Sequence, residues 1–130
     1  MEQSILKGTK KILGIDADYT AFDHDIITHI NSAFSTLNQL GVGPPAQFFI
    51  EDDEPEWSDF FVTDESILNL VRSYVYLKVR LIFDPPATSY AIGALKEQIQ
   101  EFEWRLSTAR EDEYWTDPDP EVLDEEEVLP

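Results

Sequence analysis

Hydrophobic residues recur every three or four positions through most of the chain, a spacing that places them on one face of a helix. A short helix is predicted over Gln3–Leu13, ending at Gly14. A second helix is predicted with Thr20 as its N-cap and Gly41 as its stop. Its apolar stripe consists of Phe22, Ile26, Ile30, Ala33, Phe34, Leu37 and Leu40.

A third helix is predicted from Thr63 to Phe83, because Pro85 and Pro86 prevent it from continuing. Its apolar residues fill two neighbouring sides, so we expect this helix to be central. One side has Leu68, Val75, Val79 and Ile82, and the other has Leu70, Tyr74, Leu77 and Leu81.

A fourth helix is predicted from Thr88 or Ser89 to about Arg110, on a stripe that nearly repeats every seven residues. The stripe consists of Ala91, Ile92, Leu95, Ile99, Phe102, Leu106 and Ala109. Trp104 lies off this stripe, about 200° around the helix from Phe102. We expect Trp104 to be either covered by a loop or in contact with a partner.

The chain between the second and third helices, Val42–Phe61, has no regular period. Within it, Gln47–Ile50 is predicted to be extended, and Trp57–Phe61 to form one helical turn that carries aromatic side chains to the core. The predicted fold is therefore all-α: a small bundle of about four helices with a long central helix and an irregular loop before it.

Length and composition agree with one folded domain. The chain has 130 residues, and 42% of them are apolar, which is enough for a hydrophobic core. Cysteine is absent, which excludes disulfides and thiolate chemistry. No apolar run has the length of a signal peptide or a membrane span, so we expect a soluble product that is made in the cytosol and has no membrane partner.

Acidic residues are concentrated at the C-terminal end. The whole chain has a net charge of −18, and residues 111–130 contribute −10 of it, with ten acids and no base. We therefore expect a helical domain over 1–110 and an extended acidic arm over 111–130. The arm is interpreted either as a docking arm or as a solvated tail. Its candidate anchors are Tyr114, Trp115, Val122, Leu123, Val128 and Leu129.

Basic residues are few, so their positions are informative. Arg72 and Arg80 share one strip of the third helix with Tyr76 between them. This strip is predicted either to pair with Glu97 or Glu101 of the same chain or to meet carboxylates of a partner. Lys7, Lys10 and Lys11 form the one basic cluster, which is interpreted as a solvated helix face or as a contact for an acidic partner.

Motifs for catalysis or metal binding are not found. His29 follows Asp25 by four residues, a spacing that suits a surface pair on a helix. The segment Asp16-Ala17-Asp18 begins like a calcium loop, but Ala21 stands where glycine is required and Ile27 where glutamate is required. Phosphate-binding and nucleophile-elbow motifs are missing as well. We expect no enzymatic activity, no catalytic residue, no metal site and no cofactor.

Several segments, in this order, resemble the head–tail connector (adaptor) proteins of tailed bacteriophages. The segments are Gly41-Val42-Gly43-Pro44, Trp57-Ser58-Asp59-Phe60, Tyr74-Val75-Tyr76-Leu77-Lys78-Val79-Arg80-Leu81-Ile82-Phe83-Asp84-Pro85-Pro86 and Glu103-Trp104-Arg105-Leu106. The resemblance extends roughly from Ile5 to Trp115. Its most specific part is the run through Phe83–Pro86 followed by Glu103–Leu106.

The resemblance implies a structural virion protein whose subunits form a ring of about twelve copies under the portal in the phage neck. Such a ring extends the DNA channel without binding DNA specifically, and it offers a platform to the next neck or tail-completion protein. The resemblance also implies portal docking through C-terminal segments, here loosely residues 107–130. On this interpretation, Trp104, Arg72, Tyr76, Arg80 and the arm's anchors are candidates for subunit or portal contacts.

The net charge of −18 favours the conduit over a nucleic-acid binder, because an acidic wall repels DNA. The same charge predicts that rings assemble only on the portal or at raised ionic strength. An alternative is an acidic DNA mimic that inhibits a DNA-binding host protein. More than half of the net charge lies in the proline-containing arm rather than on a folded face, which argues against mimicry.

Overall fold

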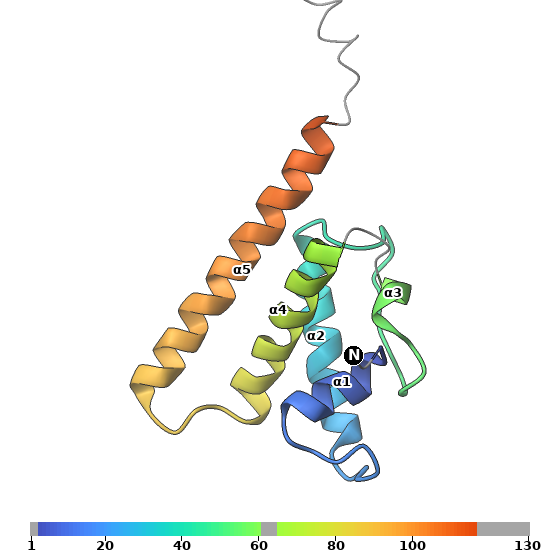
Figure 1. Ribbon diagram of the computed structural model, residues 1–130, viewed down its shortest axis with the longest axis vertical. Coiled ribbons are helices and arrows are strands. Elements are labelled where there is room, and N and C mark those ends of the chain that lie inside the picture. Colours follow the sequence, from blue (N-terminus) through green and yellow to red (C-terminus); the bar gives the residue numbers. More distant parts are fainter. Residues whose placement is uncertain (1–2, 61–64, 117–130) are drawn as a thin grey trace, which may run out of the picture.

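The computed structural model describes residues 3–60 and 65–116, and the side chains among them as far as Ala109. Within this part of the chain the regular elements are all helices, as predicted (Figure 1). In order they are α1 (Ile5–Ile12), α2 (Asp23–Gln39), α3 (Trp57–Phe60), α4 (Glu65–Phe83) and α5 (Ser89–Thr116).

Most helix ends lie where the sequence predicts them. Ser4 caps α1, and its hydroxyl accepts a hydrogen bond from the backbone N–H of Lys7. Gly14 and Gly41, with φ of 79° and 82°, supply the left-handed residues that follow α1 and α2. The prediction of Thr20 as the cap of α2 is wrong. Its carbonyl accepts from Asp23 N in a separate turn, and the helix begins only after that turn.

The long helix α4 is central, as predicted, with α2 packed against one side and α5 against another (Figure 1). α1 and α3 lie on the side of the bundle away from α5. α2 and α4 run antiparallel, and so do α4 and α5. The C-terminal end of α5 therefore projects from the opposite end of the bundle to the α4–α5 loop (Figure 1).

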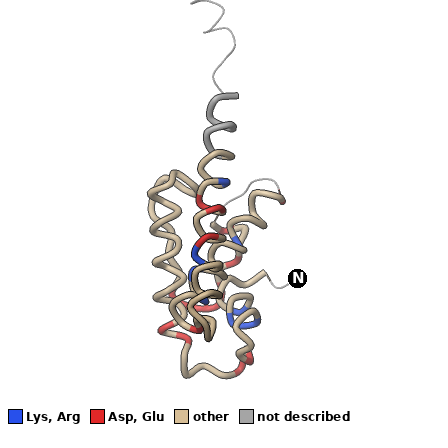
Figure 2. The backbone as a smooth tube through the Cα atoms, turned by 90° about the vertical axis from the view of Figure 1, so that its left-hand side faces the viewer, with Lys and Arg blue, Asp and Glu red and all other residues tan. Residues whose placement is uncertain are grey.

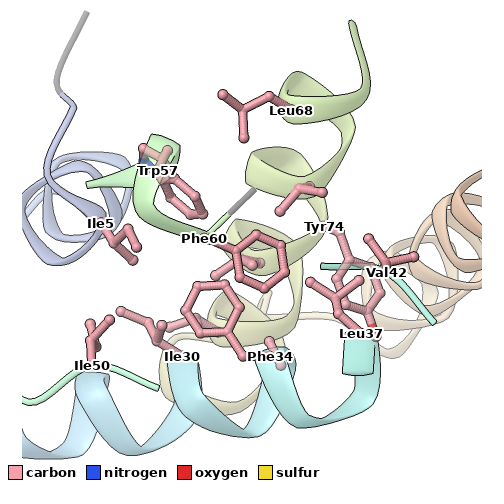
Figure 3. Close-up of a cluster of buried hydrophobic side chains, with 14 of the residues drawn as sticks. Ile5, Ile30, Phe34, Leu37, Val42, Ile50, Trp57, Phe60, Leu68 and Tyr74 are labelled. Atoms are coloured by element: carbon pink, nitrogen blue, oxygen red, sulfur yellow. The ribbon is translucent and has the colours of Figure 1, made fainter. Parts of the chain in front are cut away.

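Aromatic rings from three segments fill the core between α2 and α4 (Figure 3). The Phe34 ring stacks on the Phe60 ring, with centroids 4.7 Å apart, and meets Trp57 and Phe48 edge-on. The predicted helical turn thus carries Trp57 and Phe60 inward, while Phe61 lies outside the described residues. Gly43 is required at its position, because its φ is 101° and a Cβ there would lie 2.6 Å from the Phe60 ring.

The segment before α3 follows the core without strand pairing among the described residues, apart from a single bridge between Ser4 and Glu56. The Asn31 side chain replaces a neighbouring strand here. Its amide oxygen accepts from Ile50 N at 2.8 Å, and its amide nitrogen donates to Ile50 O at 3.0 Å. The predicted extended piece is therefore held to α2 by the Asn31 hydrogen bonds and by the contact between Phe48 and Phe34.

Two large residues of the predicted apolar stripes are exposed. Phe22 is 41% exposed and Ile82 is 55% exposed. Both lie at helix ends, Phe22 just before α2 and Ile82 in the last turn of α4, beyond the region where the helices cover each other. The predicted start of α4 at Thr63 lies outside the described residues.

Candidate assembly surfaces

Lys10 of the basic cluster is not on a solvated face. Its side chain is 2% exposed, and its ammonium group contacts the loop between α1 and α2. The ammonium Nζ donates to the carbonyls of Ala17 at 3.0 Å and Tyr19 at 2.7 Å, and it lies 2.7 Å from the carboxylate of Asp23. A buried ammonium is tolerated because these three oxygens replace its water. Lys10 therefore fixes this loop against α1.

The remaining lysines of the cluster are exposed. Lys7 Nζ lies 3.7 Å from Asp53, and both side chains are about half exposed. Lys11 borders a depression of about 460 Å³ together with Gly14 and Ile15. Within the basic cluster, Lys7 and Lys11 are therefore the two lysines available to an acidic partner.

The predicted strip of Arg72, Tyr76 and Arg80 is interrupted. Arg72 is 6% exposed, and its guanidinium donates to the Asn69 side chain. Tyr76 is half-buried and meets the Trp57 ring edge-on, with centroids 5.7 Å apart. Arg80, one turn further, is exposed and has no ion pair with a described residue. Of the three residues, Arg80 alone presents a charge to the surface.

The predicted pairing of this strip with Glu97 or Glu101 is wrong. Glu101 instead pairs with Arg105 of its own helix at 3.3 Å. The reason is the orientation of α4. Tyr74, two residues after Arg72 and about 200° around the helix, faces α5.

Tyr74 makes a polar contact between α4 and α5. Its side chain is fully buried, and its hydroxyl donates to the Glu103 carboxylate at 2.7 Å. Burial, with the adjacent Glu103 carboxylate, raises the pKa of the Tyr74 phenol well above its usual value. The hydroxyl therefore stays protonated and fixes the register of α5 on α4.

The outer face of α5 has no cover within the described part of the chain. Its buried residues Leu95, Ile99 and Leu106 face α4. Trp104 points away from them and is 68% exposed, so no described loop covers it. Tyr90, which the sequence analysis did not single out, is 87% exposed. It lies fourteen residues before Trp104 and thus on nearly the same helical face, so the helical spacing already contained this signal. Figure 2 views the molecule from this side.

The fourth predicted helix is longer than the sequence indicated. α5 continues to Thr116, six residues past the predicted end at Arg110. The side chains of the candidate anchors Tyr114, Trp115, Val122, Leu123, Val128 and Leu129 lie outside the described residues.

A second exposed apolar surface lies at the end of the bundle where α2 begins and α4 ends. We define this aromatic pole as Tyr19, Phe22, Ile82 and Phe83. The Phe22 ring contacts Tyr19 at 5.7 Å and Phe83 at 5.4 Å between centroids. His29 lies behind Phe83, at 6.5 Å, and has no ion pair with Asp25 among the described residues. The sequence analysis missed this surface, because it joins residues from a loop and two helix ends.

No constellation for chemistry is seen in the part of the chain that the structure describes. A depression of about 460 Å³ beside α3 is lined by acids and two phenylalanines, but no group of three potential metal ligands gathers anywhere among the described residues. The features that stand out are surfaces rather than pockets.

The family comparison identifies the kind of protein. A family model described as phage connector protein matches residues 5–113, most of the chain. The chain belongs to the phage connector protein family. No curated protein and no solved structure matches the connector significantly.

Membership makes the connector a structural component of the phage virion that joins head and tail. Connectors of this family associate with portal and tail proteins. Membership gives no support to the DNA-mimic alternative. None of the helices in the described residues has the length and hydropathy of a membrane span.

Proposed function

We propose that this connector forms a ring of about twelve copies directly below the portal, where it extends the DNA channel and links the head to the next neck or tail-completion protein. The observation that carries this proposal is the outer face of α5. A closed ring requires each subunit to offer a face that its own fold leaves uncovered, and to offer a different face in return.

The α5 face suits a subunit contact. Tyr90 and Trp104 are the most exposed large hydrophobic residues of the described chain. Fourteen residues of helix separate them by about 21 Å. Gly93 lies between them with nothing within 4 Å of where its Cβ would be, so a neighbour can approach the backbone closely. Tyrosine and tryptophan at such positions commonly dominate the binding energy of an interface.

Arg80 and the arm complete the proposed contacts. Arg80 is exposed and lacks a described acidic partner, so it is available to a carboxylate of a neighbour or of the portal. The arm holds apolar anchors, Leu123 and Leu129 among them, in an acidic segment. We assign the arm to the portal. Arg72 and Tyr76 contact Asn69 and Trp57 within the subunit, so we do not assign them to a subunit or portal contact.

The charge of the connector suits a conduit. Twelve copies at −18 each would present a strongly acidic ring, and an acidic wall repels passing DNA rather than binding it. DNA would therefore pass through the ring without specific recognition.

Electron microscopy of the connector mixed with its portal tests the proposal. We expect the wild type to form a ring on the portal, and Trp104→Ala with Tyr90→Ala to prevent ring closure. Phe49→Ser is the matched control, because Phe49 is 59% exposed but lies on the loop before α3. Truncation after Thr116 keeps all of α5 and should abolish portal attachment. A wild-type connector that stays monomeric beside the portal would refute the proposal.

A further inference from the structure

The aromatic pole is an apolar surface that no described part of the chain covers. Tyr19, Phe22 and Ile82 are 51%, 41% and 55% exposed. The rings of Tyr19, Phe22 and Phe83 form a continuous set of contacts between the loop before α2 and the last turn of α4, where Ile82 precedes Phe83. Contiguous exposed apolar surface of this kind marks an interaction site.

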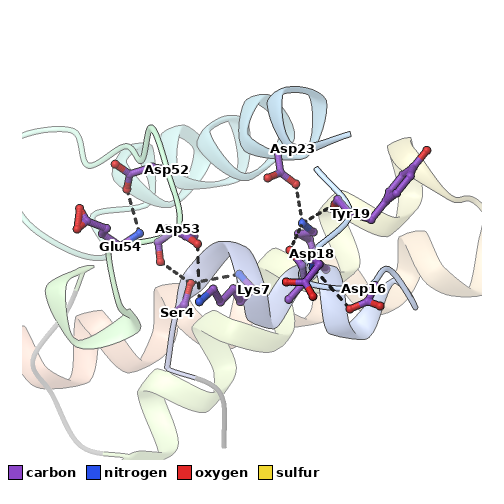
Figure 4. Close-up of polar contacts among 11 residues, drawn as sticks. Ser4, Lys7, Asp16, Asp18, Tyr19, Asp23, Asp52, Asp53 and Glu54 are labelled. Atoms are coloured by element: carbon purple, nitrogen blue, oxygen red, sulfur yellow. Dashed lines mark hydrogen bonds and ion pairs between the residues drawn. The ribbon is translucent and has the colours of Figure 1, made fainter. Parts of the chain in front are cut away.

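The pole is fixed before any partner arrives. Lys10 holds the carbonyls of Ala17 and Tyr19, so the loop that carries the Tyr19 ring cannot swing freely. Figure 4 shows the Tyr19 ring pointing away from this cluster of polar contacts. A surface that is already ordered loses little conformational entropy when a partner binds.

The exposed charges beside the pole are mainly acidic. Asp16 and Asp18 precede Tyr19, Asp25 follows Phe22, and Asp84 follows Phe83; all are exposed, and none has an ion pair with a described residue. Two bases are also near this end of the chain segments: Lys11 in the last turn of α1, and Arg80 three residues before Phe83 on α4. The rim therefore has an excess of negative charge. It disfavours DNA and a second copy of the same surface, and it favours a protein with lysine or arginine around an apolar centre.

The position of the pole selects between the connector's two kinds of partner. Because α5 runs antiparallel to α4, its C-terminal end at Thr116 lies at the opposite end of the bundle from the pole (Figure 1). In the proposed function the arm meets the portal. The pole then faces away from the head.

We infer that the aromatic pole is the docking surface for the tail-side neck protein, which contacts it with an apolar surface surrounded by basic residues. The inference rests on the proposed function, because it takes the arm as the portal-facing end.

The test uses phage heads assembled without connector, to which purified connector and then purified tails of the same phage are added. The polar variant is Phe22→Ser with Ile82→Ser, and the charge variant is Asp18→Lys with Asp84→Lys. Matched controls elsewhere on the surface are Phe49→Ser for the first and Glu51→Lys with Glu54→Lys for the second. Circular dichroism verifies that each variant keeps its helices. The charge variant changes only exposed residues, so it remains informative if the polar variant does not fold.

Each variant has two readouts, the connector bound to heads and the number of joined particles. We expect both pole variants to bind heads as the wild type does and to lower joining at least tenfold, while the controls join normally. Normal joining by the charge variant would overturn the inference but leave the proposed function standing. Loss of head binding would also overturn it, because the pole would then be a subunit or portal contact. If the wild type itself fails to bind heads, the proposed function and the inference fall together.

Discussion

Replacing Lys10 by methionine removes three polar contacts while keeping an unbranched side chain that is one atom shorter. The ammonium Nζ binds two loop carbonyls at 3.0 and 2.7 Å and the Asp23 carboxylate at 2.7 Å. Breaking a buried ion pair by removing one partner costs about 3–5 kcal/mol. The Asp23 side chain is 26% exposed, so water can solvate part of the carboxylate that Lys10→Met leaves unpaired. We therefore expect Lys10→Met to cost about 3 kcal/mol, at the lower end of that range.

Urea unfolding followed by circular dichroism measures this loss directly. A decrease of about 3 kcal/mol in the free energy of unfolding lowers the urea midpoint by about 2 M, for a slope of about 1.5 kcal/mol/M. Lys7→Met is the matched control. Lys7 lies 3.7 Å from Asp53 in an exposed pair, so its loss should cost less than about 1 kcal/mol.

A double variant separates the lost charge pair from the lost carbonyl contacts. Adding Asp23→Asn to Lys10→Met removes the carboxylate that the single variant leaves unpaired, so the double variant should be more stable than Lys10→Met. Equal costs for Lys10→Met and Lys7→Met would refute the conclusion that a buried ammonium holds the loop. A double variant less stable than Lys10→Met would show that the uncompensated carboxylate is not the cause.

Three further predictions concern packing, pH and salt. Gly43→Ala should destabilise the fold by about 2 kcal/mol or more, because residue 43 has a positive φ and an added Cβ would clash with Phe60. Gly93→Ala, in open space on α5, should instead stabilise the fold by about 0.5–1 kcal/mol in the same urea assay. The folded protein keeps the Tyr74 proton above the usual tyrosine pKa of about 10, whereas the unfolded chain loses it there, so wild-type stability should fall by up to about 1.4 kcal/mol per pH unit above pH 10. The Tyr74→Phe variant should lack this decrease. A constant difference in stability between the two proteins from pH 8 to 11 would contradict the prediction. Ring formation without portal should rise with ionic strength in sedimentation velocity, and rings at low salt would show that self-repulsion does not control assembly.

The sequence predicted the helices better than the surfaces, for a physical reason. Helical periodicity and glycine stops act over a few residues, so the end of α2 before Gly41 could be placed from local pattern. The burial of Lys10 depends on how the next loop returns over α1. The burial of Arg72 depends on the side chains packed around α4, which the spacing of residues within α4 does not reveal. Ile82 fits its stripe but lies past the end of the contact between helices. Trp104 was recognised because its exposure follows from the position of its own helical face.

The antiparallel order of the last two helices explains how one small subunit can contact several partners. α5 begins at the same end of the bundle as the aromatic pole and ends, after 28 residues, at the opposite end. At 1.5 Å per residue it is about 42 Å long, enough to span the subunit and project from it. Its inner face is fixed to α4 by Leu95, Ile99 and the Tyr74–Glu103 hydrogen bond, so movement at one end is carried rigidly to the other. In the proposed ring, one helix would therefore set the distance between head and tail contacts, while its outer face contacts the neighbouring subunit.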